Sequence, residues 1–282
     1  MDEIKTSDIS AENRAEILNI IENFRLMDDT FMSKVFEDKA CAELLLRVIL
    51  NRDDLTVVRV VSQFELKNLQ GRSARLDIYA IDEHGKQYDV EVQRSDDGAA
   101  PRRARYNSSL LDANLLNPGD KFDELPESYI IFITEHDVLK GGKPLYTVNR
   151  TISELDHAIF ADGSHIIYVN GEIRNGTALG ELMQDFFCKD PREMHYKVLS
   201  DRAGYFKKDK EGVDTMCKLV EDYGEKRARQ AAEAAAEKAA KERSISIATN
   251  LWNKGERDLQ QIADLTDLPL DEVKKLFEGK TA

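Results

Sequence analysis

The chain has 282 residues, of which 41% are hydrophobic and 33% are charged, the composition of a globular protein with a polar surface. No run approaches the roughly 18 apolar residues of a membrane-spanning helix, and the amino terminus lacks the apolar core of a signal peptide. We therefore predict no membrane partner. The net charge of −13 argues against a surface that coats nucleic acid, although it permits a local basic groove. The three cysteines form no CxxC pair and fit a reducing cytoplasm.

The first quarter of the chain combines helical and extended patterns. Apolar residues recur at helical spacing over 10–26 and 37–50, which predicts two helices. The β-branched run at 56–66 then predicts a strand.

Two alternating runs, 75–81 and 88–93, flank a polar turn that contains Gly85, and they predict an antiparallel hairpin. Because side chains alternate along a strand, Asp77, Asp89, Glu91 and Gln93 fall on one face. A turn centred near His84 pairs positions that sum to about 168, which places Asp77 opposite Glu91. Facing carboxylates repel each other, and a shared divalent cation is the simplest reason to place them there.

The middle of the chain predicts alternating helices and strands. Pro101 begins a helix of about 15 residues, and 129–134 is the continuous apolar run of a strand covered on both faces. Further strands are predicted near 145–151 and 165–169, and further helices at 177–188 and 211–223. This order indicates an α/β or α+β core with a mixed sheet.

The last quarter changes composition. Residues 225–243 are rich in Ala, Glu, Lys and Arg and predict a solvated helical connector, while 245–278 predict short helices around a tight turn, the outline of a helix-turn-helix. DNA binding, protein contact, oligomerisation and simple capping of the connector all stay open for this tail. The predicted divisions are an N-terminal helical segment at 1–27, a main domain at 28–222, the connector at 223–243 and the tail at 244–282.

The hairpin residues suggest metal chemistry. A hard cation such as Mg²⁺ takes oxygen ligands, which Asp77, Glu91 and the Val92 carbonyl could supply. Such an ion would polarise a phosphate and lower the pKa of a bound water, and Gln93 could orient that water. Mn²⁺ and Ca²⁺ are the alternatives. Lys140 to Lys143 lack the spacing of a phosphate-binding loop, so we expect no nucleotide cofactor.

Several sequence segments resemble those of one protein family. Asn68-Leu-Gln-Gly-Arg-Ser-Ala-Arg-Leu-Asp77, Tyr88-Asp-Val-Glu91-Val-Gln93 and Arg103-Ala-Arg-Tyr-Asn-Ser are similar to the Rpn-type PD-(D/E)xK nuclease family transposases, as are the segments 131–138 and 165–171. The resemblance implies a restriction-endonuclease-like α/β core with an all-α C-terminal tail. It also implies a metal-dependent DNA endonuclease of the recombination-promoting type, with Asp77 and Glu91 as its metal-binding acids.

One departure and three further roles follow from this resemblance. Gln93 replaces the usual Lys and is uncharged at pH 7, so the alternative is a nuclease fold that binds DNA or regulates without cleaving it. The superfamily also places a Glu on its first core helix, for which Glu43 is the first candidate and Glu37 the second; an exposed helix position is the alternative reading of Glu43. DNA phosphates could contact Arg103, Arg105 and Tyr106, or these residues could form a solvated basic helix end. Paired cuts in duplex DNA would favour a homodimer.

Overall fold

The computed structural model describes residues 11–68 and 71–278. The chain divides into two compact units, Met1–Leu219 and Val220–Ala282. Within the described residues, no helix combines the length and the apolar character that a membrane crossing requires.

The first unit is built on a mixed six-stranded sheet in the order β1-β2-β3-β4-β8-β5. Strands β1, β2 and β3 form an antiparallel meander, β3, β4 and β8 run parallel, and β5 returns antiparallel at the far edge. This mixed sheet, flanked by helices and followed by a helical C-terminal region, confirms the predicted fold class. The strand bounds are Val57–Leu66 (β1), Ala74–Asp82 (β2), Gln87–Gln93 (β3), Ser128–Thr134 (β4), Leu145–Val148 (β5) and Ser164–Asn170 (β8).

The β2–β3 hairpin has the predicted register. Tyr79 pairs with Asp89 and Ala80 with Tyr88, so paired positions sum to 168. Gly85 adopts a φ of 79° in the turn, a conformation open to glycine because it has no Cβ. The Asp82 carboxylate closes the turn by accepting hydrogen bonds from the His84 and Lys86 amides.

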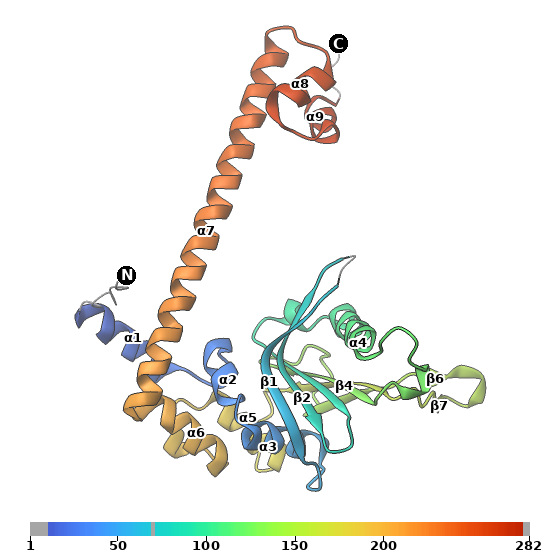
Figure 1. Cartoon of the computed structure of the whole chain (residues 1–282), viewed down its shortest axis with the longest axis vertical. Helices are drawn as coiled ribbons and strands as arrows, with labels where there is room; N and C mark the ends of the chain where they lie inside the picture. The colour runs from blue at the N-terminus through green and yellow to red at the C-terminus, as the bar shows by residue number, and fades with distance from the viewer. Residues whose placement is uncertain (1–10, 69–70, 279–282) are drawn as a thin grey trace. The chain divides into compact units, whose positions relative to one another are not determined.

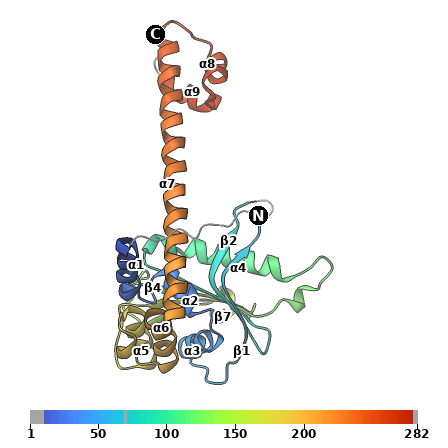
Figure 2. The same ribbon diagram turned by 60° about the vertical axis from the view of Figure 1, so that its left-hand side comes forward.

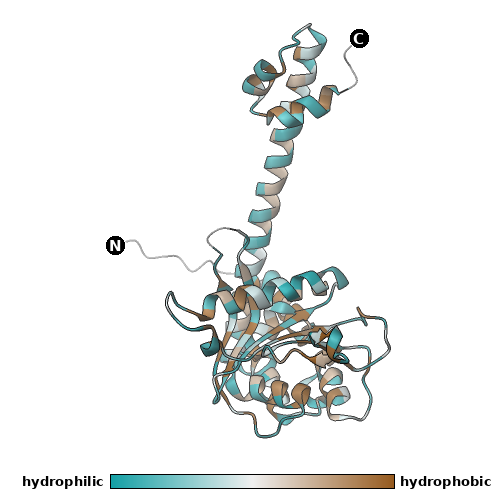
Figure 3. Cartoon of the chain, turned by 90° about the vertical axis from the view of Figure 1, so that its right-hand side faces the viewer, coloured by the Kyte–Doolittle hydropathy of each residue, from teal (hydrophilic) through white to brown (hydrophobic). Residues whose placement is uncertain are grey.

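Helices cover both faces of the sheet (Figures 1 and 2). On one side lie α2 (Asp29–Val35), α3 (Lys39–Leu50), α5 (Ala178–Phe187) and α6 (Lys197–Lys208), and on the other lies α4 (Pro101–Leu115). Strand β4 is buried from both sides, as its continuous apolar sequence predicts, with Ile130 and Phe132 packed in the cluster that α4 covers. Figure 3 shows hydrophobic residues, in brown, in the strands of the sheet and in helices that lie beside it.

Several boundaries differ from the sequence expectation. The predicted strand at 145–151 is interrupted: β5 ends at Val148, and Thr151–Ile152 (β6) pairs instead with Ala158–Ile159 (β7) in a separate two-stranded ribbon. Helices α2 and α6 were not predicted: α2 has only seven residues, and α6 carries charged residues along much of its length. The predicted N-terminal helix is α1 (Ala11–Asn23); Ser10 and the residues before it lie outside the described residues.

The second unit contains the end of a long helix and two short ones. Helix α7 runs without a break from Lys210 to Asn253, so the predicted divisions at 222/223 and 243/244 both fall inside it. It is followed by α8 (Leu259–Thr266), capped by Asp258, and α9 (Leu270–Phe277). A small core closes this end, where Trp252 stacks on Phe277 at 4.4 Å and Ala263 lies between the helices.

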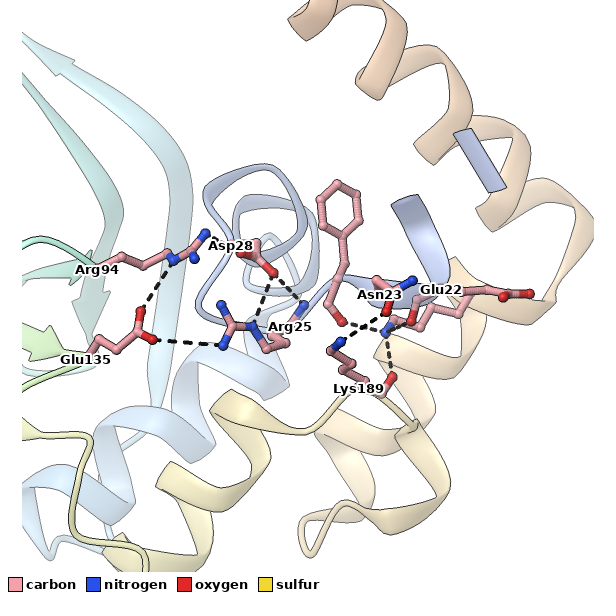
Figure 4. Close-up of polar contacts among 9 residues, drawn as sticks. Glu22, Asn23, Arg25, Asp28, Arg94, Glu135 and Lys189 are labelled. Atoms are coloured by element: carbon pink, nitrogen blue, oxygen red, sulfur yellow. Dashed lines mark hydrogen bonds and ion pairs between the residues drawn. The ribbon is translucent and has the colours of Figure 1, made fainter. Parts of the chain in front are cut away.

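A half-buried lysine fastens the α1–α2 connection to α6. Lys207 of α6 donates to the carbonyls of Glu22, Phe24 and Lys189 at 3.1, 2.5 and 2.5 Å. Its Nζ also lies 5.1 Å from the centre of the Phe31 ring. Figure 4 shows Glu22 and Asn23 near Lys189, with the hydrogen bond from Lys189 to Asn23. These bonds fix the approach of the chain to α2, which lies against β1 and β2.

Lys207→Met should lower the free energy of unfolding by about 2 kcal/mol, because it removes a charged donor that three carbonyls share. Urea denaturation measures this difference. Lys208→Met is the matched control: its exposed side chain pairs with Asp190 only at 3.7 Å, so the expected change is below about 0.5 kcal/mol. Equal stability of the two variants would contradict a fastening role for Lys207.

Candidate active site

Asp77 lies where the two strands of the hairpin stop pairing. The β2–β3 ladder ends at Ile78 and Val90, and beyond it the Asp77 carboxylate accepts the Val92 amide at 3.1 Å. A side-chain oxygen thus takes the place of a backbone acceptor. This bond holds Asp77 beside the strand segment that carries Glu91.

Glu91 is fully buried and held by three side chains. Its Oε2 accepts from Arg103 at 2.5 Å and from the Gln93 amide at 3.2 Å, while Oε1 lies 3.5 Å from the Asn107 amide. Arg103 and Asn107 lie one turn apart on α4. The helix that begins at Pro101 therefore supplies the polar cover over this face of β3.

A third carboxylate, Asp89, lies next to Glu91 along the same strand face. Asn107 donates to its Oδ2 at 3.3 Å, while Oδ1 is buried and has no hydrogen-bond partner among the described residues. The sequence alternation placed Asp89 on this face without giving it a role. The structure shows it as part of one buried acidic group with Asp77 and Glu91.

Burial and mutual repulsion raise the pKa of each of these carboxyl groups. Burial raises the pKa of Asp77 to about 6, although the Val92 amide opposes the shift. Burial and the Asp77 charge raise the pKa of Glu91 to about 8, against the opposing Arg103 charge. The pKa of Asp89 is raised well above its ordinary value, first by burial and then by Glu91 and Asp77.

Asp29, at the start of α2, is a neighbour that the sequence did not reveal. Its charge contributes to the raised pKa of Asp77, so the two carboxylates lie within electrostatic range. Burial and Asp28 in turn raise the pKa of Asp29, and the charges of Arg75 and Arg94 oppose this. No spacing rule connects position 29 with position 77, because only the packing of α2 on β1 and β2 brings them together.

A network of charges fixes the start of α2 against the strand ends. Arg94, directly after β3, contacts Asp28 at 3.0 Å and Glu135 at 3.3 Å, as Figure 4 shows. Arg25 contacts the same two acids at 3.7 and 4.0 Å. The four side chains tie the α1–α2 connection to the ends of β3 and β4, and so set the position of Asp29.

Gln63 is a second site residue that sequence reasoning missed. It lies in β1 between Ser62, which pairs with Ile78, and Phe64, which pairs with Leu76, so it faces Asp77. Its φ is 53°, which is rare for a residue with a side chain, and its amide lies 3.4 Å from the Asp77 carboxylate. Such backbone strain is typical of functional sites, but a strand-like sequence gives no sign of it.

The predicted DNA-contacting residues occupy different positions. Arg103 points into the acidic group, where it donates to Glu91, to the Gln93 Oε1 at 3.4 Å and to the Gly98 carbonyl at 3.0 Å. Arg105 is exposed and forms no ion pair with a described residue. The Tyr106 hydroxyl donates to the Arg72 carbonyl and accepts from Asn68 at 3.1 Å, so Tyr106 ties the end of the β1–β2 hairpin to α4.

The structure does not bring Glu43 to the acidic group. Its carboxylate accepts the Val57 amide at 2.9 Å and pairs with Arg47 at 2.8 Å, which joins α3 to the start of β1. Glu37 contacts Lys34 at 2.8 Å and the Ser62 hydroxyl at 3.1 Å. A place for Glu43 at a metal would require it to give up both of its bonds.

The oxygen donors of the acidic group fit a hard divalent cation. Asp77 and Glu91 offer carboxylates, and the Asp89 Oδ1 is a buried oxygen with no hydrogen-bond partner among the described residues. Among the described residues, no three or more His, Cys, Asp or Glu side chains gather as a metal-binding group. The predicted set of two carboxylates and the Val92 carbonyl is smaller than that and stays compatible with this arrangement.

Comparison with known proteins gives one match. A family model described as "PD-(D/E)XK nuclease family transposase" matches residues 32–176, just over half of the chain. The matched range contains Asp77, Glu91, Gln93 and Arg103, but it begins after Asp29. No curated protein and no solved structure matches the chain significantly.

The acidic group should make stability depend on pH. Asp77 and Glu91 have pKa values near 6 and 8 in the folded chain against ordinary values of 3.8 and 4.5. Between about pH 4 and 8 the folded chain therefore binds more protons than the unfolded chain, so the free energy of unfolding falls as the pH rises. Because a pKa difference of one corresponds to about 1.4 kcal/mol, we expect these two groups to lower the free energy of unfolding by on the order of 5 kcal/mol from pH 4.5 to 8.5, measured by urea denaturation.

The double variant Asp77→Asn, Glu91→Gln should weaken this dependence to the part that Asp89 contributes and be the more stable protein at pH 8.5. Glu83→Gln, in the exposed hairpin turn, is the control and should follow the wild type. A double variant with the full pH slope would show that other groups produce it.

Proposed function

Because the chain belongs to the PD-(D/E)XK nuclease family of transposases, we propose that it is a metal-dependent DNA endonuclease of the recombination-promoting type. The observation that carries this proposal is the pair of half-buried Asp77 and fully buried Glu91 beside a partly exposed Arg103. Buried like charges are costly, and a cation together with a phosphate substrate gives them a use. The proposed cation is Mg²⁺, with Mn²⁺ or Ca²⁺ as alternatives.

Asp77, Glu91 and the Val92 carbonyl would hold the ion. When bound, the ion would polarise the scissile phosphate and lower the pKa of an attacking water. The Val92 amide fixes the Asp77 carboxylate, and the Gln93 and Asn107 amides fix Glu91. Gln93 is itself oriented at both ends, since its Nε2 donates to Glu91 and its Oε1 accepts from Arg103. A remaining lone pair on Oε1 can accept a hydrogen bond from the water.

The reaction is hydrolysis of a phosphodiester. A water oxygen bonds to phosphorus, the bond from phosphorus to the leaving oxygen breaks, and the leaving oxygen gains a proton. The products are a phosphate monoester and a hydroxyl end. The chain requires no covalent intermediate for this step, and no side chain of the site is a serine or cysteine.

A local basic surface supports DNA as the partner. The end of the β1–β2 hairpin and the first turns of α4 carry exposed side chains that form no ion pair with another described residue: Lys67, Arg72, Arg75, Arg102 and Arg105. Tyr106 and Asn68 join these two elements, so the basic residues belong to one surface. In a chain of net charge −13, such a concentration of unpaired positive charge suits the phosphate backbone.

We further propose a cytoplasmic location and, because duplex cleavage needs two strands cut, a homodimer. The location is supported by the small number of cysteines, which are widely spaced and form no CxxC pair. A second candidate function is a nuclease fold that binds DNA without cutting it, which the neutral Gln93 favours. Under both candidate functions, the tail at 245–278 would contact DNA or another protein.

Plasmid cleavage with Mg²⁺ or Mn²⁺ tests the enzyme. Asp77→Asn and Glu91→Gln should each reduce the rate at least about 100-fold, because each removes a charged ligand while keeping the side-chain shape. Glu83→Gln should cleave at the wild-type rate. Wild-type DNA binding without cleavage in either metal would favour the second candidate, and unchanged cleavage by both acid variants would overturn the site.

Neutralising the basic surface should weaken DNA binding without reaching the metal site. The variant Lys67→Ala, Arg72→Ala, Arg102→Ala, Arg105→Ala should bind duplex DNA at least about tenfold more weakly and show a shallower dependence of log affinity on log salt. Fluorescence anisotropy at several salt concentrations measures both. The control replaces four other exposed lysines with Ala (Lys39, Lys121, Lys140 and Lys143), which changes the net charge equally. Equal losses in the two variants would show that only the total charge matters.

A further inference from the structure

Arg103 is anchored along one part of its guanidinium group. Nη2 donates to Glu91 at 2.5 Å, and Nη1 donates to the Gly98 carbonyl at 3.0 Å and lies 3.4 Å from the Gln93 Oε1. The three acceptors come from β3 and from the turn before α4. The guanidinium therefore has a fixed position between the metal-binding acid and the residue that replaces the family's usual lysine.

The rest of the group is available to a ligand. The Nε–H and one Nη2–H have no acceptor among the described residues, and the side chain is 40% exposed although Glu91 below it is fully buried. Two N–H donors on one planar cation are what bidentate binding of a phosphate requires. Its charge also lowers the pKa of Asp77, Asp89 and Glu91, which makes Arg103 the shared positive neighbour of the acidic group.

Gly98 makes this arrangement possible. A Cβ at this position would lie 2.0 Å from the Gln93 Oε1, so any side chain would push the Gln93 amide away from Arg103. The Gly98 carbonyl also accepts one of the guanidinium bonds. The absence of a side chain at Gly98 therefore allows the neutral Gln93 amide to contact the Arg103 guanidinium of α4.

We propose that Arg103 binds the scissile phosphate and supplies the positive charge that Gln93 lacks. This inference rests on the proposed nuclease function and adds a catalytic residue to it. In the transition state, negative charge builds up on the phosphate oxygens, and a fixed cation at that point stabilises it more than it stabilises the bound substrate. Glu91, Gln93 and Gly98 hold the guanidinium in place, so little reorganisation is needed when DNA binds.

The test combines kinetics with a measurement that does not depend on cleavage. Arg103→Met should lower kcat by about 100-fold or more and change KM by less than about threefold. Gln93→Lys in the Arg103→Met background should recover at least about tenfold in kcat, because it returns a cation to the site. Lys39→Met, on the exposed start of α3, is the matched control and should behave as the wild type.

Binding of Mg²⁺ alone, measured by calorimetry, separates this role from a structural one. Removing a positive charge beside the acidic group should leave Mg²⁺ binding unchanged or tighter. Weaker Mg²⁺ binding by Arg103→Met, with no recovery by Gln93→Lys, would show that Arg103 only positions Glu91 and would overturn the proposal. If the wild type cleaves and Arg103→Met cleaves equally fast, the Arg103 assignment fails alone. If the wild type does not cleave, the nuclease function fails with it.

Discussion

The site depends on the repulsion among carboxylates that the fold forces together. The antiparallel register of β2 and β3 brings Asp77 to Glu91, and the alternation of β3 adds Asp89 to the same face. The surrounding structure limits the resulting cost: the Val92 amide, Asn107 and Arg103 each direct a donor to this group. The sheet, α4 and the start of α2 can be understood as the frame that keeps these charges close while leaving part of the negative charge uncompensated.

Because Gln93 stands where the family usually has a lysine, the positive charge beside the acidic group comes from another element. A lysine in β3 would carry its charge on the same strand as Glu91, whereas here the charge comes from the first turn of α4. The position of α4 therefore matters for chemistry as well as for burial. Its packing through Ala104, Leu110 and Leu111 on the sheet fixes the distance between the guanidinium and the acids.

The sequence predicted the parts of this protein that follow from local periodicity. Alternation predicted the hairpin and its register, Pro101 predicted the start of α4, and the apolar run predicted β4. Local periodicity could not predict the site residues that only tertiary packing brings together. Asp29 approaches Asp77 only because α2 packs on the sheet, and the left-handed backbone of Gln63 has no signature in a run of strand-forming residues. Glu43 was chosen from its place on a core helix, but helix position alone does not say from which donor a carboxylate accepts a hydrogen bond.

The charge network of Arg25, Asp28, Arg94 and Glu135 has a consequence for how this core could be exchanged or shortened. The segment that matches the family begins at residue 32, yet two members of the network and Asp29 precede it. The lysine that fastens their connection, Lys207, follows the matched segment by some thirty residues. A transplanted or minimal domain cut at the family boundaries would keep Asp77 and Glu91 but lose the brace that sets Asp29. The module that could be transferred is thus the whole first unit, because residues before and after the family segment both hold the start of α2 in place.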